Sequence, residues 1–154
     1  IEEQVKMQLA IREDLNVVSD MISRLEWIRK QLDDLKAAVG AGKDARGLEA
    51  IEEFDKKIQS VEYELFQPTL AEGDTKSFRD PLKIYMKLSV LAGDLSDSVD
   101  FSPNRQQRDV HAVLKERLMV QKARFDALLK ADLPAFNKTL EEKKLSGIIV
   151  PEIK

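Results

Sequence analysis

The chain has 154 residues, of which 43% are hydrophobic and 34% charged, with only 6 glycines and 5 prolines. Apolar residues that are both plentiful and regularly spaced exclude a disordered chain and are typical of long amphipathic helices. The 25 basic and 28 acidic residues are mixed along the chain, so no basic stripe indicates nucleic-acid binding. The lack of cysteine excludes disulfides, thiolate zinc sites and thiol nucleophiles. No apolar run approaches the roughly 20 residues that span a bilayer.

The first segment predicts one long helix over residues 3–39. Its apolar residues recur in steps of three or four, which average the 3.5-residue period of a coiled-coil seam. Gly40 and Gly42 are expected to end this helix, and Asp44 to cap a second one over residues 45–66. The short connection makes residues 1–66 an antiparallel helical hairpin. The seam consists of Ile11, Leu15, Val18, Ile22, Leu25, Ile28, Leu32, Leu35 and Val39.

Residues 67–79 predict a linker. Asp80 and Pro81 then resemble the start of a third helix over residues 80–99, because proline is well tolerated in the first helical turn. Ser102 and Pro103 repeat this signal for a fourth helix that runs to about residue 131. The third and fourth helices form a second hairpin. Residues expected to face inward on the fourth helix are Val110, Val113, Leu114, Leu118, Phe125 and Leu128.

Asp132 and Pro134 are expected to interrupt the chain and restart it as a short fifth helix, which Gly147 ends. Residues 80–147 therefore contain the second hairpin and this short helix, and residues 148–154 form a tail. Ile148, Ile149 and Val150 in the tail fit either a β-like segment or an extended strip packed on the bundle. The predicted fold is all-α, an up-down bundle of four main helices in two antiparallel hairpins plus a short C-terminal helix, in a single domain over residues 1–154.

No set of residues predicts catalysis, a cofactor or a metal site. His111 is the single histidine, and Arg108 stands three residues before it, where a carboxylate-bridged metal site would place a glutamate. We therefore expect a surface histidine and a protein that is not an enzyme. The loop acids Glu72, Asp74 and Asp80 match no calcium-binding loop. Neighbouring acids on helices point in different directions and are expected to be solvated, namely Asp33 with Asp34, Glu52 with Glu53, and Glu141 with Glu142.

The first helix carries a candidate interaction surface. The first helix is longer than the second, so the second helix cannot bury the apolar residues near the start of the first. Another part of the protein or a partner is expected to pack against them. Trp27 lies beside the seam, and tryptophan is enriched at protein contacts. The predicted surface consists of Val5, Leu9, Ile11 and Trp27.

The second half of the chain also carries a recognisable pattern. Its elements are Asp80-Pro81-Leu82, Lys87-Leu88, Leu91, Pro103, Gln106, Val110, Asp132-Leu133-Pro134-Ala135-Phe136-Asn137, Leu140, Leu145 and Ile149-Val150-Pro151. This pattern resembles the C-terminal helical region of bacterial sortilin-like, Asp-box (BNR) repeat proteins, which are often labelled glycosyl-hydrolase-like. The resemblance implies a β-propeller elsewhere in the native chain and a periplasmic or extracellular location. No Asp-box occurs in these 154 residues, so no catalytic residue is carried over.

Because the chain begins with Ile1 inside an amphipathic helix, we expect it to be one domain of a longer protein. Its expected function is non-catalytic, either packing against another domain of the native chain, such as the β-propeller, or contacting a protein partner. One alternative is an accessory part of a glycosyl-hydrolase-like enzyme whose active site lies in other residues. A second alternative is a self-associating coiled-coil scaffold, which forms a homodimer.

Overall fold

The computed structural model describes residues 2–41, 45–66, 83–98, 101–145 and 147–150. The described residues form helices and short connections without a strand. The helices are α1 (Glu2–Ala41), α2 (Ala45–Leu65), α4 (Ile84–Asp97), α5 (Arg105–Ala127), the π-helical turn η2 (Leu128–Asp132) and α6 (Leu133–Glu142). This confirms the predicted all-α bundle with two antiparallel hairpins. The predicted linker at 67–79 lies outside the described residues.

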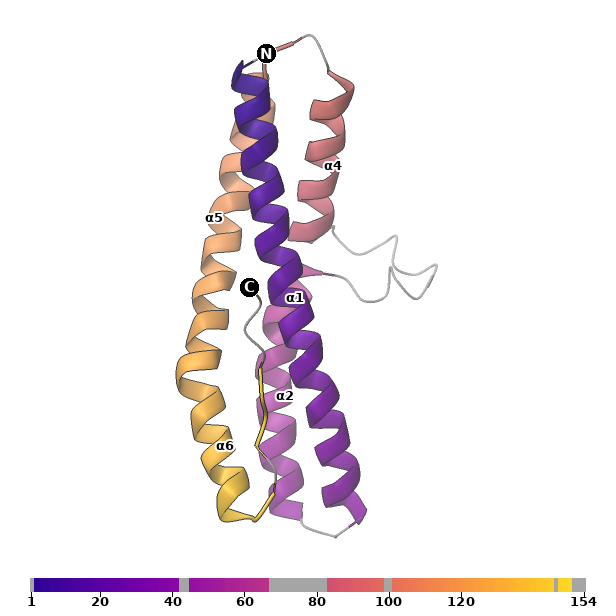
Figure 1. The fold of residues 1–154 in the computed structure, drawn as a ribbon, viewed down its shortest axis with the longest axis vertical. Coiled ribbons are helices and arrows are strands. Elements are labelled where there is room, and N and C mark those ends of the chain that lie inside the picture. The colour runs from indigo at the N-terminus through magenta and orange to yellow at the C-terminus, as the bar shows by residue number, and fades with distance from the viewer. Residues whose placement is uncertain (1, 42–44, 67–82, 99–100, 146, 151–154) are drawn as a thin grey trace.

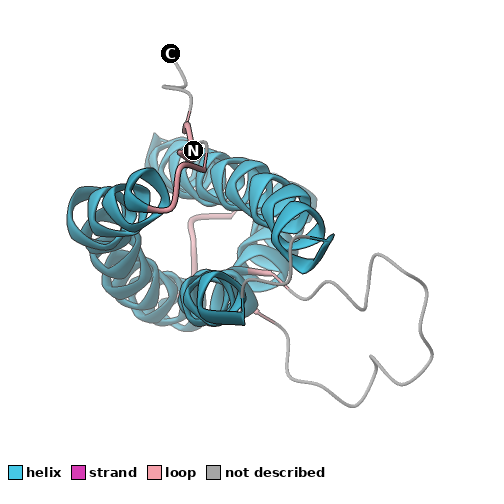
Figure 2. Cartoon of the chain, turned by 90° about the horizontal axis from the view of Figure 1, so that it is seen from below, coloured by secondary structure: helices cyan, strands magenta, loops and turns pink. Residues whose placement is uncertain are grey.

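The bundle consists of three rods that lie side by side along one long axis (Figures 1 and 2). One rod is α1, and another is α5 continued by η2 and α6. The third rod is split, because α2 covers the lower half of α1 and α4 covers the upper half (Figure 1). At about 1.5 Å per residue, the 21 residues of α2 and the 14 of α4 together nearly match the 40 residues of α1. Thus α4 covers the part of α1 that extends beyond α2.

A single apolar core follows the whole axis. The seam predicted for the first helix lies in this core, with Leu15, Ile22 and Leu35 partly buried and its other members fully covered. Phe54 of α2 stacks on Phe136 of α6, with 4.5 Å between ring centroids. At the junction of the split rod, Phe66 meets Tyr85 edge to face at 6.1 Å. Fully burying one such side chain stabilises the fold by about 1.5–3 kcal/mol.

Two helix starts differ from the prediction. Lys83 has an extended backbone, so α4 begins at Ile84, later than predicted, while Asp80 and Pro81 lie outside the described residues. The helix α5 is capped by Asn104 rather than by Ser102. The Gln107 N–H donates to Asn104 Oδ1 at 2.8 Å, and the Asn104 N–H donates to Gln107 Oε1 at 3.0 Å. This reciprocal capping box satisfies two backbone donors that a helix start leaves free.

The predicted interruption at Asp132 and Pro134 is wrong, because α5, η2 and α6 form one joined helix. In η2 the Leu133 N–H donates to the Leu128 carbonyl five residues back. Pro134 follows directly and has no N–H to donate. The wider π-helical turn therefore takes up one extra residue just before the proline without ending the helix.

Residues 148–150, the part of the tail that the structure describes, form an extended strip packed on the bundle. The Ile148 N–H donates to Asn137 Oδ1 at 2.7 Å, and Asn137 Nδ2 donates to the Ile148 carbonyl at 3.0 Å. Gln31 makes the same pair of bonds to Ile149, at 2.9 and 2.7 Å. Ile148 is buried. The strip therefore joins α6 to α1 through two side-chain amides.

Candidate protein interaction face

The outer side of α4 carries few charges. Only Lys87, Asp94 and Asp97 are charged among its 14 residues. Its inner side buries four aliphatic residues, Ile84, Leu88, Leu91 and Leu95. Its outer side adds Val90, which is 49% exposed, and small residues such as Ser89 and Gly93. A helix that is apolar on more than one side is usually packed against other protein surfaces on more than one side.

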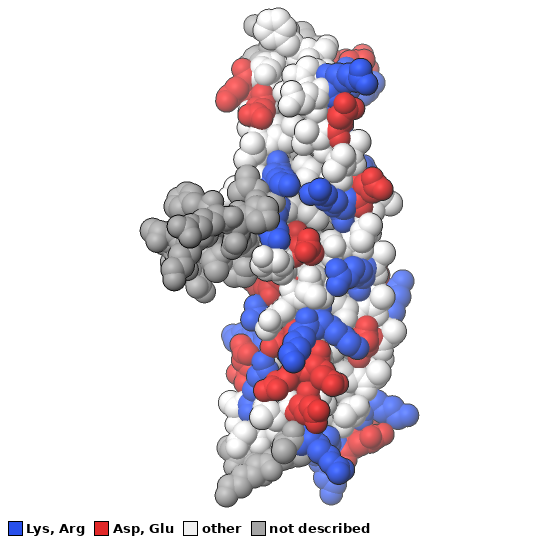
Figure 3. Space-filling model, turned by 180° about the vertical axis from the view of Figure 1, so that it is seen from behind, with Lys and Arg blue, Asp and Glu red and all other residues white. Residues whose placement is uncertain are grey.

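A groove runs between α4 and α5. Its apolar lining includes the buried Ile84 and Leu91 and four valines that are each 41–53% exposed, Val90, Val110, Val113 and Val120. The groove has two hollows of about 600 and 580 Å³, and Lys87 lines both. We call this surface, formed by the four valines and Lys87, the α4–α5 groove. Figure 3, which shows the molecule from behind, has fewer charged side chains in the upper half than in the lower half.

Val110 and Val113 were expected to face inward, and this prediction is wrong. The helix α5 buries Leu114, Leu118 and Phe125 along a narrower stripe. Only α1 and α4 pack against its upper half, since the bundle has three rods there. The two valines therefore lie on the flank of the stripe, where a fourth rod would be needed to cover them.

The predicted interaction residues do not form one surface. Val5 and Leu9 are 46% and 53% exposed and line a hollow of about 400 Å³ between α1 and α4. Ile11 is fully buried, so its assignment to the surface is wrong; it shares the inner face of α1 with Met7 and Val18. Trp27 is exposed but lies about 27 Å further along the axis than Leu9.

Charged side chains also lie between α1 and α2, a position that the sequence pattern did not predict for them. Arg29 Nη1 donates to Glu62 Oε2 at 2.8 Å, and Lys36 Nζ donates to Asp55 Oδ2 at 2.5 Å. Both carboxylates are buried, and burial raises the pKa of Glu62 while the neighbouring Arg29 opposes this rise. The signal in the sequence was the shared spacing, since Arg29 and Lys36 are seven residues apart on α1, as are Asp55 and Glu62 on α2.

His111 is also not the surface histidine that was expected. Its side chain is only 14% exposed, and its Nε2 lies 2.8 Å from Asp14 Oδ2 on α1. Lys115 approaches the same carboxylate at 4.0 Å. The pair is a polar crosslink between α1 and α5. The part of the chain that the structure describes contains no group of three or more histidines and acids placed to hold a metal ion.

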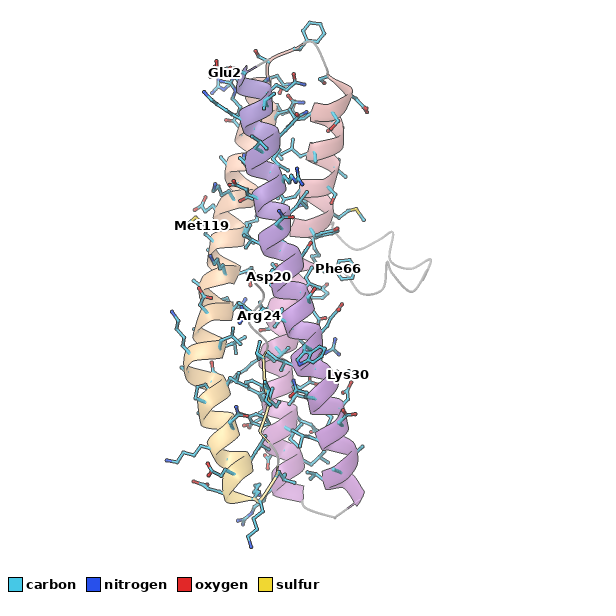
Figure 4. The ribbon with its side chains drawn as sticks, in the orientation of Figure 1. Glu2, Asp20, Arg24, Lys30, Phe66 and Met119 are labelled. Carbon is cyan, nitrogen blue, oxygen red and sulfur yellow. The ribbon has the colours of Figure 1, made fainter. Side chains whose placement is uncertain are left out.

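A further polar contact joins the same two helices near the middle of the bundle. Asp20 and Arg24 lie one turn apart on α1 (Figure 4). The Arg24 guanidinium lies over the Phe125 ring of α5, 5.2 Å from its centroid. Stacking on an aromatic face is a favourable position for an arginine that is partly removed from water. This contact, like the other buried charges, holds helices together.

Comparison of the chain with protein-family models, curated proteins and solved structures found no match. No helix within the described residues is long and apolar enough to cross a membrane.

Proposed function

We propose that this chain is a non-catalytic helical domain that contacts another protein surface through the α4–α5 groove. The observation that supports this proposal is the row of exposed valines, Val90, Val110, Val113 and Val120, beside two hollows. Single exposed apolar residues are ordinary, but a continuous apolar groove with a polar rim is typical of contact sites. Covering these side chains gains about 25 cal/mol for each Å² removed from water.

The buried polar groups favour this function over catalysis. Arg29 of α1 forms ion pairs with Glu62 and, at a longer distance, with Asp55 of α2, and His111 of α5 bonds to Asp14 of α1. Each pair thus connects two rods, and none of these residues lines the hollows beside the valines. His111 lines a separate hollow of about 390 Å³ between α1 and α5, where its Nε2 is bonded to Asp14. A catalytic site would need several such groups to face one hollow that admits a substrate.

The native protein that we propose is a multidomain exported protein of which this bundle is the C-terminal region. The motivation is the resemblance of the second half to the C-terminal helical region of bacterial BNR-repeat proteins, in which a β-propeller precedes the helices. Lys87, Leu91 and Val110 belong both to that pattern and to the lining of the groove.

Site-specific photo-cross-linking in the full native protein tests the contact. A benzophenone side chain at Val113 is expected to cross-link to a folded partner surface, whereas one at the exposed Lys138 on α6 is expected to give no such product. Peptide mapping then identifies the partner surface. Equal cross-linking at both positions, or none at Val113, contradicts the proposed function.

A further inference from the structure

A stripe of charged residues on α4 has a symmetrical order. Lys83 and Lys87 precede Val90, and Asp94 and Asp97 follow it, in steps of four, three, four and three residues. These steps place Lys87, Val90, Asp94 and Asp97 on one side of α4, and Lys83, whose backbone is extended, directly precedes the helix. All five also line the hollows of the α4–α5 groove. The stripe is thus basic at the start of α4, apolar at Val90 and acidic at its end.

This order does not stabilise α4 itself. The start of a helix carries a partial positive charge and its end a partial negative charge, so lysines at the start and aspartates at the end each cost a few tenths of a kcal/mol. No ion pair compensates for them, because Lys87, Asp94 and Asp97 make no salt bridge with any residue that the structure describes. Lys83 lies over the Tyr63 ring at 3.8 Å. Among the described residues, the charges of Lys87, Asp94 and Asp97 are therefore unpaired and can contribute to a contact with a partner.

We propose that a second copy of this chain is that partner, with the two α4 helices antiparallel about a two-fold axis at Val90; this inference rests on the proposed function of the groove. Antiparallel pairing places Lys87 opposite Asp94 of the second copy and Lys83 opposite Asp97 of the second copy. Because the axis is two-fold, each contact occurs twice. Parallel pairing would place lysine against lysine and is disfavoured.

The valines supply most of the attraction in this dimer. Val90 meets Val90 of the second copy. In each copy, Val110 and Val113 of α5 lie beside the α4 helix of the other copy. Exposed ion pairs contribute at most about 1 kcal/mol each, so the charges set the orientation more than the affinity. Glu64, Glu116 and Arg117 are exposed at the lower end of the groove. Together with Lys83 and Lys87 they make three basic and two acidic residues, so this end carries one net positive charge.

Complementary charge reversals test the pairing. In Lys87→Asp, position 87 repels Asp94 of the second copy, and in Asp94→Lys, position 94 repels Lys87 of the second copy. In a mixture of the two variants, every contact between positions 87 and 94 is again attractive. Both substitutions also agree better with the helix dipole than the native residues do, so α4 is expected to stay folded.

The measurement is sedimentation equilibrium over a range of concentrations. The native chain is expected to shift from 17.5 kDa toward twice that mass as concentration rises. Each variant alone is expected to need at least tenfold higher concentration to dimerise, and the equimolar mixture is expected to recover the native behaviour. Lys138→Asp, which changes the charge equally on α6, is the matched control and is expected to dimerise as the native chain does.

A mixture that stays monomeric overturns the inference, as does a native chain that stays monomeric at millimolar concentration. Native-like dimerisation of both single variants overturns it too. If cross-links from Val113 reach another domain while the chain itself stays monomeric, the proposed function stands and only the second copy is excluded. If Val113 gives no cross-link, the proposed function itself fails.

Discussion

Individual charged residues in this bundle act as connections between helices. Arg29 reaches Glu62 at 2.8 Å and approaches Asp55 at 3.7 Å, so one guanidinium faces both buried carboxylates of α2. A buried carboxylate without a cation is strongly unfavourable, whereas a paired one is tolerated. The matching seven-residue spacings on α1 and α2 therefore help to fix how the two helices align.

Arg29→Ala is expected to lower the free energy of unfolding by about 1–3 kcal/mol at neutral pH, since it leaves Glu62 buried without its cation. Burial raises the pKa of Glu62 above its ordinary 4.5, and loss of Arg29 raises this pKa further. The folded protein then holds the Glu62 proton more tightly than the unfolded chain does, so this group favours folding increasingly as pH falls through the raised pKa toward 4.5.

Urea unfolding at several pH values checks this prediction. The deficit of Arg29→Ala relative to the native chain should be largest at neutral pH and should shrink as the solution is acidified. Lys30→Ala, on the exposed side of α1, is the control and should change stability by less than about 0.5 kcal/mol. A deficit that is the same at all pH values would contradict the role assigned to Glu62.

Leu9 and Ile11 provide a second test at the level of single residues. Ile11→Glu places a charge in the core and is expected to cost more than about 4 kcal/mol, because Ile11 is fully buried. Leu9→Glu is expected to change stability by less than about 0.5 kcal/mol, because Leu9 is 53% exposed. Thermal melts followed by circular dichroism compare the two. Similar melting temperatures for the two variants would show that the face assigned to α1 is wrong.

At the level of elements, the joined helix Arg105–Glu142 contains one residue more than a regular helix would. Its buried positions follow steps of three and four except for a single step of five, from Leu128 to Leu133, at the π-helical turn. The turn therefore keeps the residues of α6 on the same face as those of α5. The buried residues are Leu114, Leu118, Gln121, Phe125, Leu128, Leu133, Phe136 and Leu140.

Deletion of Ala131 tests this account. The deletion alone forces Pro134 into a regular helix, where proline costs about 3 kcal/mol. Deletion combined with Pro134→Ala is expected to return to within about 1 kcal/mol of the native stability, because α6 keeps its register and Phe136 still reaches Phe54. Chemical unfolding measures both variants.

Ala123 supplies the matched control, because it is exposed in the regular part of α5. Its deletion should shift every later buried residue and unfold the protein. If the combined variant at Ala131 and Pro134 is as unstable as the single deletion, the π-helical turn has a role beyond register. The ion pair of Asp132 with Lys57 at 2.9 Å would then be the first contact to test.

At the level of the whole molecule, two of the three rods run through both halves. The split in the third rod, between α2 and α4, therefore does not divide the core, which is continuous from Met7 to Ile148. Tyr85 and Phe66 also bridge the split. A domain of this size with one core usually unfolds in a single step.

We expect one cooperative thermal transition, because neither half of α1 can lose its cover without exposing the other half. Scanning calorimetry checks this through the ratio of calorimetric to van't Hoff enthalpy, which should be close to one. As a control, Tyr85→Ala should lower the melting temperature and leave the single transition intact. Two resolved transitions in the native chain would show that the upper and lower halves unfold separately.

The sequence by itself determined that the chain is helical and which residues form the seam of α1. Apolar residues at three- and four-residue steps identified the α1 seam, and Gly40 and Gly42 placed its end within a few residues, because these signals depend on the local geometry of the backbone. The two hairpins were predicted from the short connection after Gly40 and from the helix-start signal at Ser102 and Pro103, although Asn104 is the residue that caps α5.

Only the tertiary structure decided which flanking residues are covered. Val113 is exposed and Ile11 is buried because burial depends on how many rods surround a given level of the bundle. His111 meets Asp14 across 97 residues of sequence, a contact that no local pattern specifies. Likewise, Pro134 ends no helix here, because packing of Phe136 and Leu140 against the other rods stabilises the helix beyond it.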